Sequence, residues 1–319
     1  MKLLVTGSSG FIGFHTCKFL LDRKIDVLGI DNNNSYYDKN LKINRLDILK
    51  KYKKFKFLFA DISKFNKKHI QEIFKFKPTH IIHLAAQPGV RFSIVNPEKN
   101  FQYNIRGFFN ILELAKQIKI KHLLFASSSS VYGNQNKRMK ESLQTDSPVS
   151  FYAATKKTNE VMAHSYSSIY KLRCTGLRFF TVFGPYGRPD MAPFIFSNSI
   201  INNKKINLNN YGNHSRDFTY IDDVTKALYN LLKNPSKNKV PFQILNIGSG
   251  KKIKLIDFVK KIEKILNLKA KITFTKFQQG DVKDTFADNT KINQIVKFNP
   301  IKLEIGLKKF LKWYKVSYK

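Results

Sequence analysis

The chain has 319 residues, of which 42% are hydrophobic and 13% aromatic, enough to bury the core of one large domain or two smaller ones. Its 57 Lys and Arg residues against 22 Asp and Glu give a formal net charge of +35, and this composition excludes a disordered or fibrous chain. The apolar runs are far shorter than the ~20 residues that span a bilayer, and Met1 leads directly into a predicted strand. We therefore expect a soluble, cytoplasmic protein.

Short apolar strands alternate with helix-length segments over the first 130 residues. Strands are predicted over residues 2–7, 25–31, 55–62, 79–86 and 122–128, and helices over 11–23 and 101–117. Each strand is apolar on both faces, as in parallel βαβ units whose sheet is covered by helices on both sides. The sequence thus predicts the α/β class, with a Rossmann-type doubly wound parallel sheet.

In the second half of the chain the regular alternation of strands and helices ends. A helix is predicted over residues 150–171 and a sixth strand over 174–180, and the segment 183–191, FGPYGRPDM, is then rich in Gly and Pro. We predict a cofactor-binding domain over residues 1–180 that includes the helix 150–171. Residues 181–319 should form mainly a smaller α/β substrate lobe, with some segments returning to the first domain, at the carboxyl edge of the sheet where such folds bind ligands.

The positive charge is spread along the chain, with dense lysines in residues 39–56, 251–271 and 302–319. This distribution indicates a compositional bias on a solvated surface more than a nucleic-acid site, although it would attract an anionic substrate. Cys17 and Cys174 have no Cys or His at metal-ligand spacing, so neither a disulfide framework nor a metal site is predicted.

Three glycines, Gly7, Gly10 and Gly13, mark the turn from the first strand into the first helix. Glycine allows a tight turn, close approach of a pyrophosphate and close packing of helix on sheet. Asp31 ends the second strand, 18 residues after Gly13, where a carboxylate accepts hydrogen bonds from ribose hydroxyls and repels a 2′-phosphate. The pattern predicts binding of NAD rather than NADP, and Asp61 is a candidate for contact with the adenine amino group.

Tyr152 and Lys156, in YAATK, share one face of the predicted helix 150–171. A nearby ammonium and a positive nicotinamide ring would lower the tyrosine pKa from about 10 and make the phenolate available as a base. A serine run, Ser127 to Ser130, ends the fifth strand about 20 residues earlier in the chain. This combination predicts proton transfer next to a bound dinucleotide.

The motifs TGSSGFIG, HLAAQ, FASSSSVYG, YAATK, RFFTVFGP and RDFTYIDD occur in this order over nearly the whole chain. They resemble those of the extended short-chain dehydrogenase/reductase family, in its NAD-dependent nucleotide-sugar epimerase and dehydratase branch. Within that branch, AAQPGVRFS, SPVSFYAATK and TGLRFFTVFGPYGRPDMA are similar to the UDP-glucuronate 4-epimerase group. The resemblance implies 4-epimerisation of a UDP-sugar through transient oxidation at C4, as a step that supplies polysaccharide biosynthesis.

The resemblance also implies roles for individual residues. Tyr152 is the acid/base, Lys156 its partner and a ribose ligand, and Ser128 the hydroxyl that bonds the sugar 4-oxygen. Further cofactor contacts are implied for Phe11, Ile12, Ile62, Leu84, Ala85 and Ala86. Substrate contacts are implied for Gln87, Arg91, Ser129, Ser130, Thr181, Arg188, Tyr211, Arg216 and Asp281. For Arg91 the alternative is an exposed loop arginine, and for Arg216 a surface ion pair with Asp217 or Asp222.

Ser129 and Ser130 separate the chemistries of this branch. Dehydratases of the branch carry Asp-Glu directly after the catalytic hydroxyl residue and decarboxylases carry Glu two places after it, whereas this chain has serine at both places. A serine is no general base at neutral pH, and its hydroxyl suits a substrate carboxylate. Conversion of UDP-glucuronate to UDP-galacturonate is therefore favoured. The alternatives are a UDP-glucose or UDP-N-acetylhexosamine (or uronate) 4-epimerase, then a dehydratase or decarboxylase, and outside enzymes an NAD-sensing or RNA-binding protein.

Two long helices, residues 101–117 and 150–171, resemble those that pair across a homodimer in this family. Their apolar residues are equally explained by packing on the sheet. A homodimer is expected on the resemblance alone.

Overall fold

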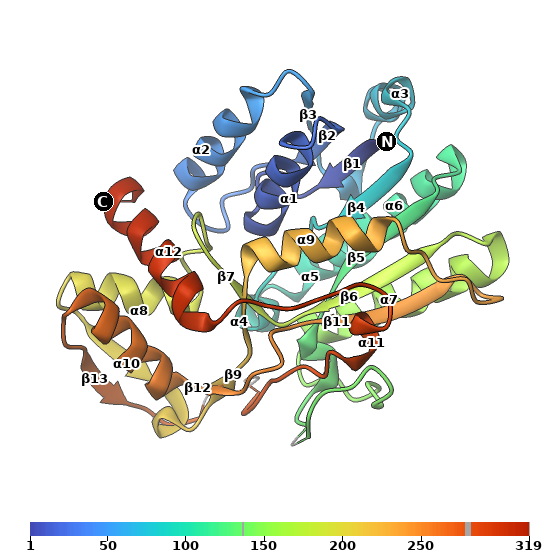
Figure 1. Cartoon of the computed structure of the whole chain (residues 1–319). Helices are drawn as coiled ribbons and strands as arrows, with labels where there is room; N and C mark the ends of the chain where they lie inside the picture. The colour runs from blue at the N-terminus through green and yellow to red at the C-terminus, as the bar shows by residue number, and fades with distance from the viewer. Residues whose placement is uncertain (136, 278–281, 319) are drawn as a thin grey trace.

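The computed structural model describes residues 1–135, 137–277 and 282–318, and within them a seven-stranded parallel sheet is the central element (Figure 1). Its strand order is β11-β6-β5-β4-β1-β2-β3. These strands are β1 (Lys2–Thr6), β2 (Asp26–Asp31), β3 (Phe55–Phe59), β4 (His80–His83), β5 (His122–Ser128), β6 (Cys174–Phe179) and β11 (Phe242–Ile247). The direction of progress reverses between β1 and β4, as in a doubly wound fold. The predicted Rossmann-type α/β class is confirmed.

Helices cover both faces of this sheet. One face carries α1 (Phe11–Leu21), α2 (Lys39–Lys50) and α9 (Ile221–Leu232), and the other carries α3 (Lys67–Phe76), α6 (Gly107–Ile118) and α7 (Phe151–Tyr170). Neighbouring strand residues point to opposite faces. Leu3 and Val5 therefore pack in one buried cluster with Phe14 of α1, whereas Leu4 packs in the other with Phe108 of α6.

The connections correct several predicted boundaries. β3 ends at Phe59 because the chain turns into the 3-10 helix η1 (Ile62–Lys64), and β4 ends at His83. β3 is an edge strand, and Phe59 is 64% exposed, so the expectation that every strand is apolar and covered on both faces is wrong here. The predicted helix 101–117 is preceded by α4 (Val90–Val95) and α5 (Pro97–Asn100) and starts as a π-helix, η2 (Phe101–Arg106), before α6.

The remaining elements belong mostly to a smaller lobe. Its short strands pair two by two, β10 with β7, β12 with β9 and β13 with β8. In Figure 1, α8, α10 and β13 lie together at the lower left, away from the sheet. The bounds are β7 (Thr181–Phe183), α8 (Ala192–Ile201), β8 (Lys205–Leu208), the 3-10 helix η4 (Asn209–Gly212), β9 (Ser215–Arg216), β10 (Phe218–Tyr220), β12 (Ile253–Lys254), α10 (Leu255–Leu266), β13 (Lys271–Phe274), α11 (Thr290–Asn293) and α12 (Leu303–Ser317).

The chain passes between the sheet and the lobe more than once. After β10 it returns through α9 to β11, which pairs with β6 at one edge of the sheet, and then leaves again. Among the described residues, each helix is too short or too polar to be a membrane span.

Candidate active site

A cavity of about 440 Å³ opens at the carboxyl ends of the sheet strands, beside the switch point between β1 and β4. Its wall combines the turn after β1, the ends of β2, β4 and β5, and β7 and β9 from the second half of the chain. It therefore gathers residues that lie far apart in sequence. The predicted site residues that line it are Gly7, Gly10, Phe11, Ile12, Gly13, Asp31, Ile62, Leu84, Ala85, Ala86, Ser128, Ser129, Ser130, Tyr152, Lys156, Thr181, Arg188 and Arg216.

Other predicted site residues are not part of the described wall; these are Asp61, Gln87, Arg91 and Tyr211. The Asp61 carboxylate caps η1 and accepts from the backbone N–H and the hydroxyl of Ser63, at 2.8 and 2.7 Å. The backbone of Gln87 is bonded through both its N–H and its C=O to the side chain of Asn104 in η2. Asp281 lies outside the described residues.

The glycine turn packs backbone directly against backbone. A Cβ at Gly13 would lie 1.9 Å from the carbonyl oxygen of Gly7, and Gly7 itself has a φ of +73°. Helix α1 begins directly after Gly10, so its free N–H groups lie at the cavity wall. Such a helix N-terminus favours a phosphate group.

Asp31 is held at the end of β2 by two backbone groups. One carboxylate oxygen accepts from the N–H of Ser9 at 3.0 Å and the other from the N–H of Asn33 at 2.8 Å. Lys42 of α2 is also buried at the wall, and its Nζ donates to the backbone and side-chain oxygens of Asn34 at 2.9 and 2.8 Å. Burial lowers the pKa of Lys42, and the charge of Asp31 opposes this shift.

Residues 32–42 were missed as part of the site. Asn32, Asn34, Tyr36, Tyr37 and Lys42 line the cavity, as do Tyr103, Met191, Val282 and Thr285 elsewhere in the chain. Residues 32–42 could have been found from their position directly after Asp31, the acidic residue that ends β2. Tyr103, Met191, Val282 and Thr285 have no local sequence signal that marks them as part of the site.

Tyr152 and Lys156 lie in the first two turns of α7, which is capped by Ser150. Lys156 is 1% exposed, and its Nζ donates to the carbonyl oxygen of Ala126 at 3.0 Å. The same Nζ lies 5.9 Å from the centre of the Tyr152 ring. Burial lowers the pKa of Lys156 to about 8, because the charged form loses its hydration.

The pKa of Tyr152 is above its ordinary value in the protein alone, whereas the lowering expected from sequence also requires the positive nicotinamide ring. Burial raises it, whereas the charge of Arg188 and a hydrogen bond with Ser128 lower it by less. Protein groups alone therefore favour the neutral phenol.

The serine run lies between the cavity and a buried ion pair. Ser128 accepts from the N–H of Ser130 at 3.1 Å, and its hydroxyl lies 3.1 Å from that of Ser130, at the start of the 3-10 helix η3 (Ser129–Tyr132). Ser127 instead donates to Glu160 of α7 at 2.6 Å. Glu160 also accepts two hydrogen bonds from Arg178 of β6, at 2.9 and 2.8 Å. This pair fixes β5, β6 and α7 relative to one another.

Arg188 closes one side of the cavity. Its guanidinium pairs with Asp190 through two hydrogen bonds, and Asp190 also accepts from the hydroxyl of Tyr36 at 3.1 Å. Burial alone would lower the pKa of Arg188, but the charge of Asp190 raises it above its usual range. The segment after β2 and the Gly/Pro-rich segment after β7 are thereby joined across the cavity.

Comparison with known proteins identifies the family. Residues 3–248 match the model of the NAD dependent epimerase/dehydratase family. The chain belongs to this family. The predicted family is confirmed, and NAD is the cofactor of this family.

Three known proteins are similar to this chain over 95% or more of their length. The UDP-glucuronate 4-epimerase of Thermodesulfobacterium geofontis is 41% identical, over 98% of this chain and 95% of that protein. The crystal structure of UDP-glucuronic acid 4-epimerase from Bacillus cereus, in complex with UDP-glucuronic acid and NAD, is 32% identical, with a TM-score of 0.92 and 99% of each chain covered. A UDP-glucose 4-epimerase from Thermotoga maritima is 25% identical, with a TM-score of 0.88 and both chains fully covered.

The cofactor of the family fits the residues at the switch point. The start of α1, with its free N–H groups, lies at the cavity wall beside Gly10, and Asp31 lies at the end of the neighbouring strand β2. Their roles as ligands of NAD, like those of the other predicted site residues, stay predictions of the family resemblance.

Proposed function

We propose that this chain is a UDP-glucuronate 4-epimerase, which interconverts UDP-glucuronate and UDP-galacturonate. The observation that carries the proposal is the row of hydroxyl groups at Ser128, Ser129 and Ser130, which shares one cavity with Tyr152 and Thr181. These hydroxyls donate hydrogen bonds to a substrate carboxylate without adding negative charge. The full-length similarity to UDP-glucuronate 4-epimerases supports the same substrate.

Tyr152 acts as the base in the first half of the reaction and as the acid in the second. It takes the proton of the sugar 4-hydroxyl, while Ser128 holds the 4-oxygen by a hydrogen bond. NAD, held by the residues at the switch point, would supply a reversible hydride acceptor for C4 of the sugar, so that the proton moved by Tyr152 is matched by a hydride in each direction. Tyr152 then gives its proton back, so no group is consumed in a full cycle.

Ionisation of Tyr152 depends on positive charge around its hydroxyl. Arg188 and Ser128 lower its pKa, but burial outweighs them in the protein alone. Lys156 contributes an ammonium whose pKa of about 8 keeps it mostly charged at neutral pH. We expect Tyr152 to ionise when oxidised NAD, with its positive nicotinamide ring, is bound.

The same hydroxyls explain why the intermediate survives. A 4-keto uronic acid is a β-keto acid and loses carbon dioxide when its carboxylate bond aligns with the carbonyl π system. Hydrogen bonds from Ser129, Ser130 and Thr181 to the carboxylate would hold that bond out of alignment. Elimination of water is disfavoured as well, because neither Ser129 nor Ser130 can act as a general base at neutral pH.

Incubation of the protein with NAD and UDP-glucuronate, followed by proton NMR, tests the proposal. We expect the large diaxial coupling of sugar H4 to be replaced by the small coupling of UDP-galacturonate. The Tyr152→Phe variant should lose at least ~10³-fold in kcat while it keeps its NAD, because only the phenol oxygen is removed.

Other outcomes would contradict the proposal. A UDP-pentose would show decarboxylation, and an unchanged H4 signal would exclude UDP-glucuronate as substrate. Conversion of UDP-glucose, and not of UDP-glucuronate, under the same conditions would establish the alternative hexose epimerase.

We also propose that the enzyme is a homodimer. Phe101 and Phe109 on η2 and α6, and Val161 and Ile169 on α7, are 45 to 64% exposed and recur at a spacing of eight residues. Since η2 and α6 both pack against α7, these apolar residues lie on neighbouring helices. Pairing with a second copy would cover them, and sedimentation equilibrium would report twice the chain mass.

A further inference from the structure

Asp217 is a fully buried carboxylate directly next to the cavity wall. It lies between Arg216 of β9, which lines the cavity, and Phe218 of β10, and its exposed fraction is 0%. This burial excludes the surface ion pair between Arg216 and Asp217 that the sequence left open. A charge removed from water in this way requires strong hydrogen-bond partners.

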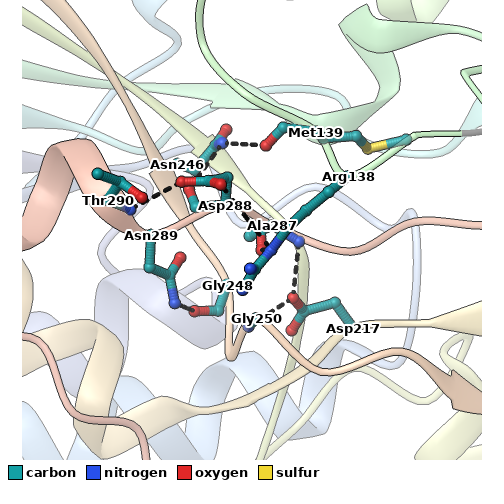
Figure 2. Close-up of polar contacts among 10 residues, drawn as sticks. All are labelled: Arg138, Met139, Asp217, Asn246, Gly248, Gly250, Ala287, Asp288, Asn289 and Thr290. Carbon is teal, nitrogen blue, oxygen red and sulfur yellow. Dashed lines mark hydrogen bonds and ion pairs between the residues drawn. The ribbon is translucent and has the colours of Figure 1, made fainter.

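The partners of Asp217 are backbone N–H groups from two distant segments (Figure 2). Its oxygens accept from the N–H groups of Gly250 and Ala287 at 2.8 and 3.0 Å, as Figure 2 shows. They also accept from the N–H group and the hydroxyl of Ser249 at 2.6 and 2.7 Å. Burial raises the pKa of Asp217, and the hydrogen bonds from Ala287, Ser249 and Gly250 oppose that rise. Both oxygens of the carboxyl group are thus held by hydrogen-bond donors of the chain.

The segment Gly248–Ser249–Gly250 forms a concave loop of the kind that binds anions. Gly250 has a φ of +73°, and a Cβ at Gly248 would lie 2.9 Å from the Asp217 carboxylate and 2.6 Å from the Cβ of Ala287. Both glycines are therefore needed for the loop to close on the carboxylate. The anion in this loop is supplied by the protein itself.

Through these contacts Asp217 joins three parts of the cavity wall. Its own carbonyl oxygen accepts from the N–H of Thr181 at 3.0 Å, and its carboxylate holds the segment that ends at Ala287. That segment carries Val282 and Thr285, which line the cavity. The N–H of Thr285 donates in turn to the carbonyl oxygen of Ser215, beside Arg216.

A second set of contacts holds the outer side of the same segment (Figure 2). Arg138 donates to the carbonyl oxygen of Ala287 at 3.1 Å, and Asn246 donates to those of Met139 and Asp288 at 2.8 and 3.2 Å. Because this side is fixed independently, loss of the Asp217 carboxylate would release the inner side of the segment without unfolding the whole loop.

We propose that Asp217 is a positioning residue for the UDP end of the substrate. It places Arg216, Thr181 and residues 282–285 around the nucleotide and the sugar, and so sets the affinity for the UDP group without taking part in proton or hydride transfer. The identity of the ligand rests on the function proposed above.

The test compares two variants with the same change, Asp217→Asn and Asp223→Asn. Asp223 is also buried and accepts a backbone N–H, from Ile301 at 2.9 Å, but neither its chain neighbours nor Ile301 line the cavity, whereas Arg216 beside Asp217 does. UDP alone is titrated calorimetrically into the NAD-loaded proteins, and kcat and KM are measured with UDP-glucuronate. We expect Asp217→Asn to raise the Kd for UDP and the KM at least about tenfold, with kcat changed less than about threefold. Asp223→Asn should bind UDP within about twofold of the wild type.

Several outcomes would overturn the inference. Asp217→Asn with unchanged UDP affinity, a loss confined to kcat, or equal losses in both variants would show that Asp217 has no specific positioning role. If Asp217→Asn does not fold, Ser249→Ala removes one hydrogen bond to the same carboxylate and should raise the Kd for UDP about threefold. An unchanged Kd in the folded Ser249→Ala variant counts against the inference. Failure of the wild type itself to bind UDP would instead contradict the proposed substrate.

Discussion

At the cofactor end of the cavity, Gly7 and Gly13 allow backbone to pack on backbone between two regular elements, β1 and α1. The opposite end, which we propose binds the UDP-sugar, is called the sugar end. There the buried polar side chains of Asp217 and Asn246 hold segments with little regular structure. The first arrangement excludes any added side chain, and the second depends on individual hydrogen bonds. The cofactor end should therefore respond to added volume and the sugar end to lost polar contacts.

Gly13→Ala should have the largest effect. Its Cβ would lie 1.9 Å from the carbonyl oxygen of Gly7 and 3.1 Å from the Cα of Ser8, both backbone atoms that cannot move aside. We expect the free energy of unfolding to fall by about 4 kcal/mol or more, measured by urea denaturation. Gly10→Ala is the control, since its Cβ would lie 3.0 Å from the same oxygen. Equal stability of Gly13→Ala and the wild type would refute the close-packing account.

Asn246→Ala tests the sugar end. Asn246 is 0% exposed, donates to two carbonyl oxygens and accepts from the hydroxyl of Tyr132 at 2.7 Å. Loss of these contacts leaves buried groups unpaired and should cost about 2–4 kcal/mol, with weaker UDP binding and retained NAD. The control is Asn234→Ala, which removes an exposed hydrogen bond to Asn230. If both substitutions lower the free energy of unfolding equally, the buried hydrogen bonds of Asn246 are not what stabilises this end.

Lys156→Met changes a buried side chain of the same cavity wall, and it should have the smallest effect on stability. Burial lowers its pKa in the folded state from 10.5 to about 8, so charging the buried lysine below pH 8 destabilises the fold. At 1.36 kcal/mol per pKa unit, less the lost bond to Ala126, the variant should be about 1–3 kcal/mol more stable at pH 7, although inactive.

The sign of the pH dependence follows from the lowered pKa. The wild-type protein gains stability as pH rises from 8 towards 10.5, because the folded state loses its proton before the unfolded state does. The advantage of Lys156→Met, measured by urea denaturation of the NAD-free protein, should shrink over that window. If the stability difference between Lys156→Met and the wild type were the same at all pH values, a lowered pKa of Lys156 would be contradicted. Lys157→Met, one residue further along α7, serves as the control.

Sequence patterns predicted the strands, the glycine turn and the helix at the cofactor end because their determinants are local. Apolar strands, the glycine turn, Asp31 and the spacing of Tyr152 and Lys156 can all be read within single elements. β3 and β4 were predicted to extend three residues too far at their C-terminal ends. The turns that end them depend on contacts of Asp61 and Asn104, which the local sequence does not show.

The sugar end could be predicted only through family resemblance. The carboxylate of Asp217 meets N–H groups 32 to 70 residues away in sequence, and no local pattern reports such a meeting. The burial that raises the pKa of Tyr152 in the protein alone is a property of the folded cavity, which the local sequence does not report. Residues 32–42 were missed because they reach the cavity only through the close packing of α2 and the segment after β7.

The serine run shows how identical residues acquire separate tasks. The hydroxyl of Ser127 is bonded to Glu160, and that of Ser128 lies beside Ser130 at the cavity wall, although the two serines are chemically the same. Successive side chains of a strand point to opposite sides, so the register of β5 alone directs one hydroxyl to Glu160 and the next to Ser130. A slip of β5 by one residue against its neighbouring strands would leave the composition of the run unchanged and exchange these two tasks.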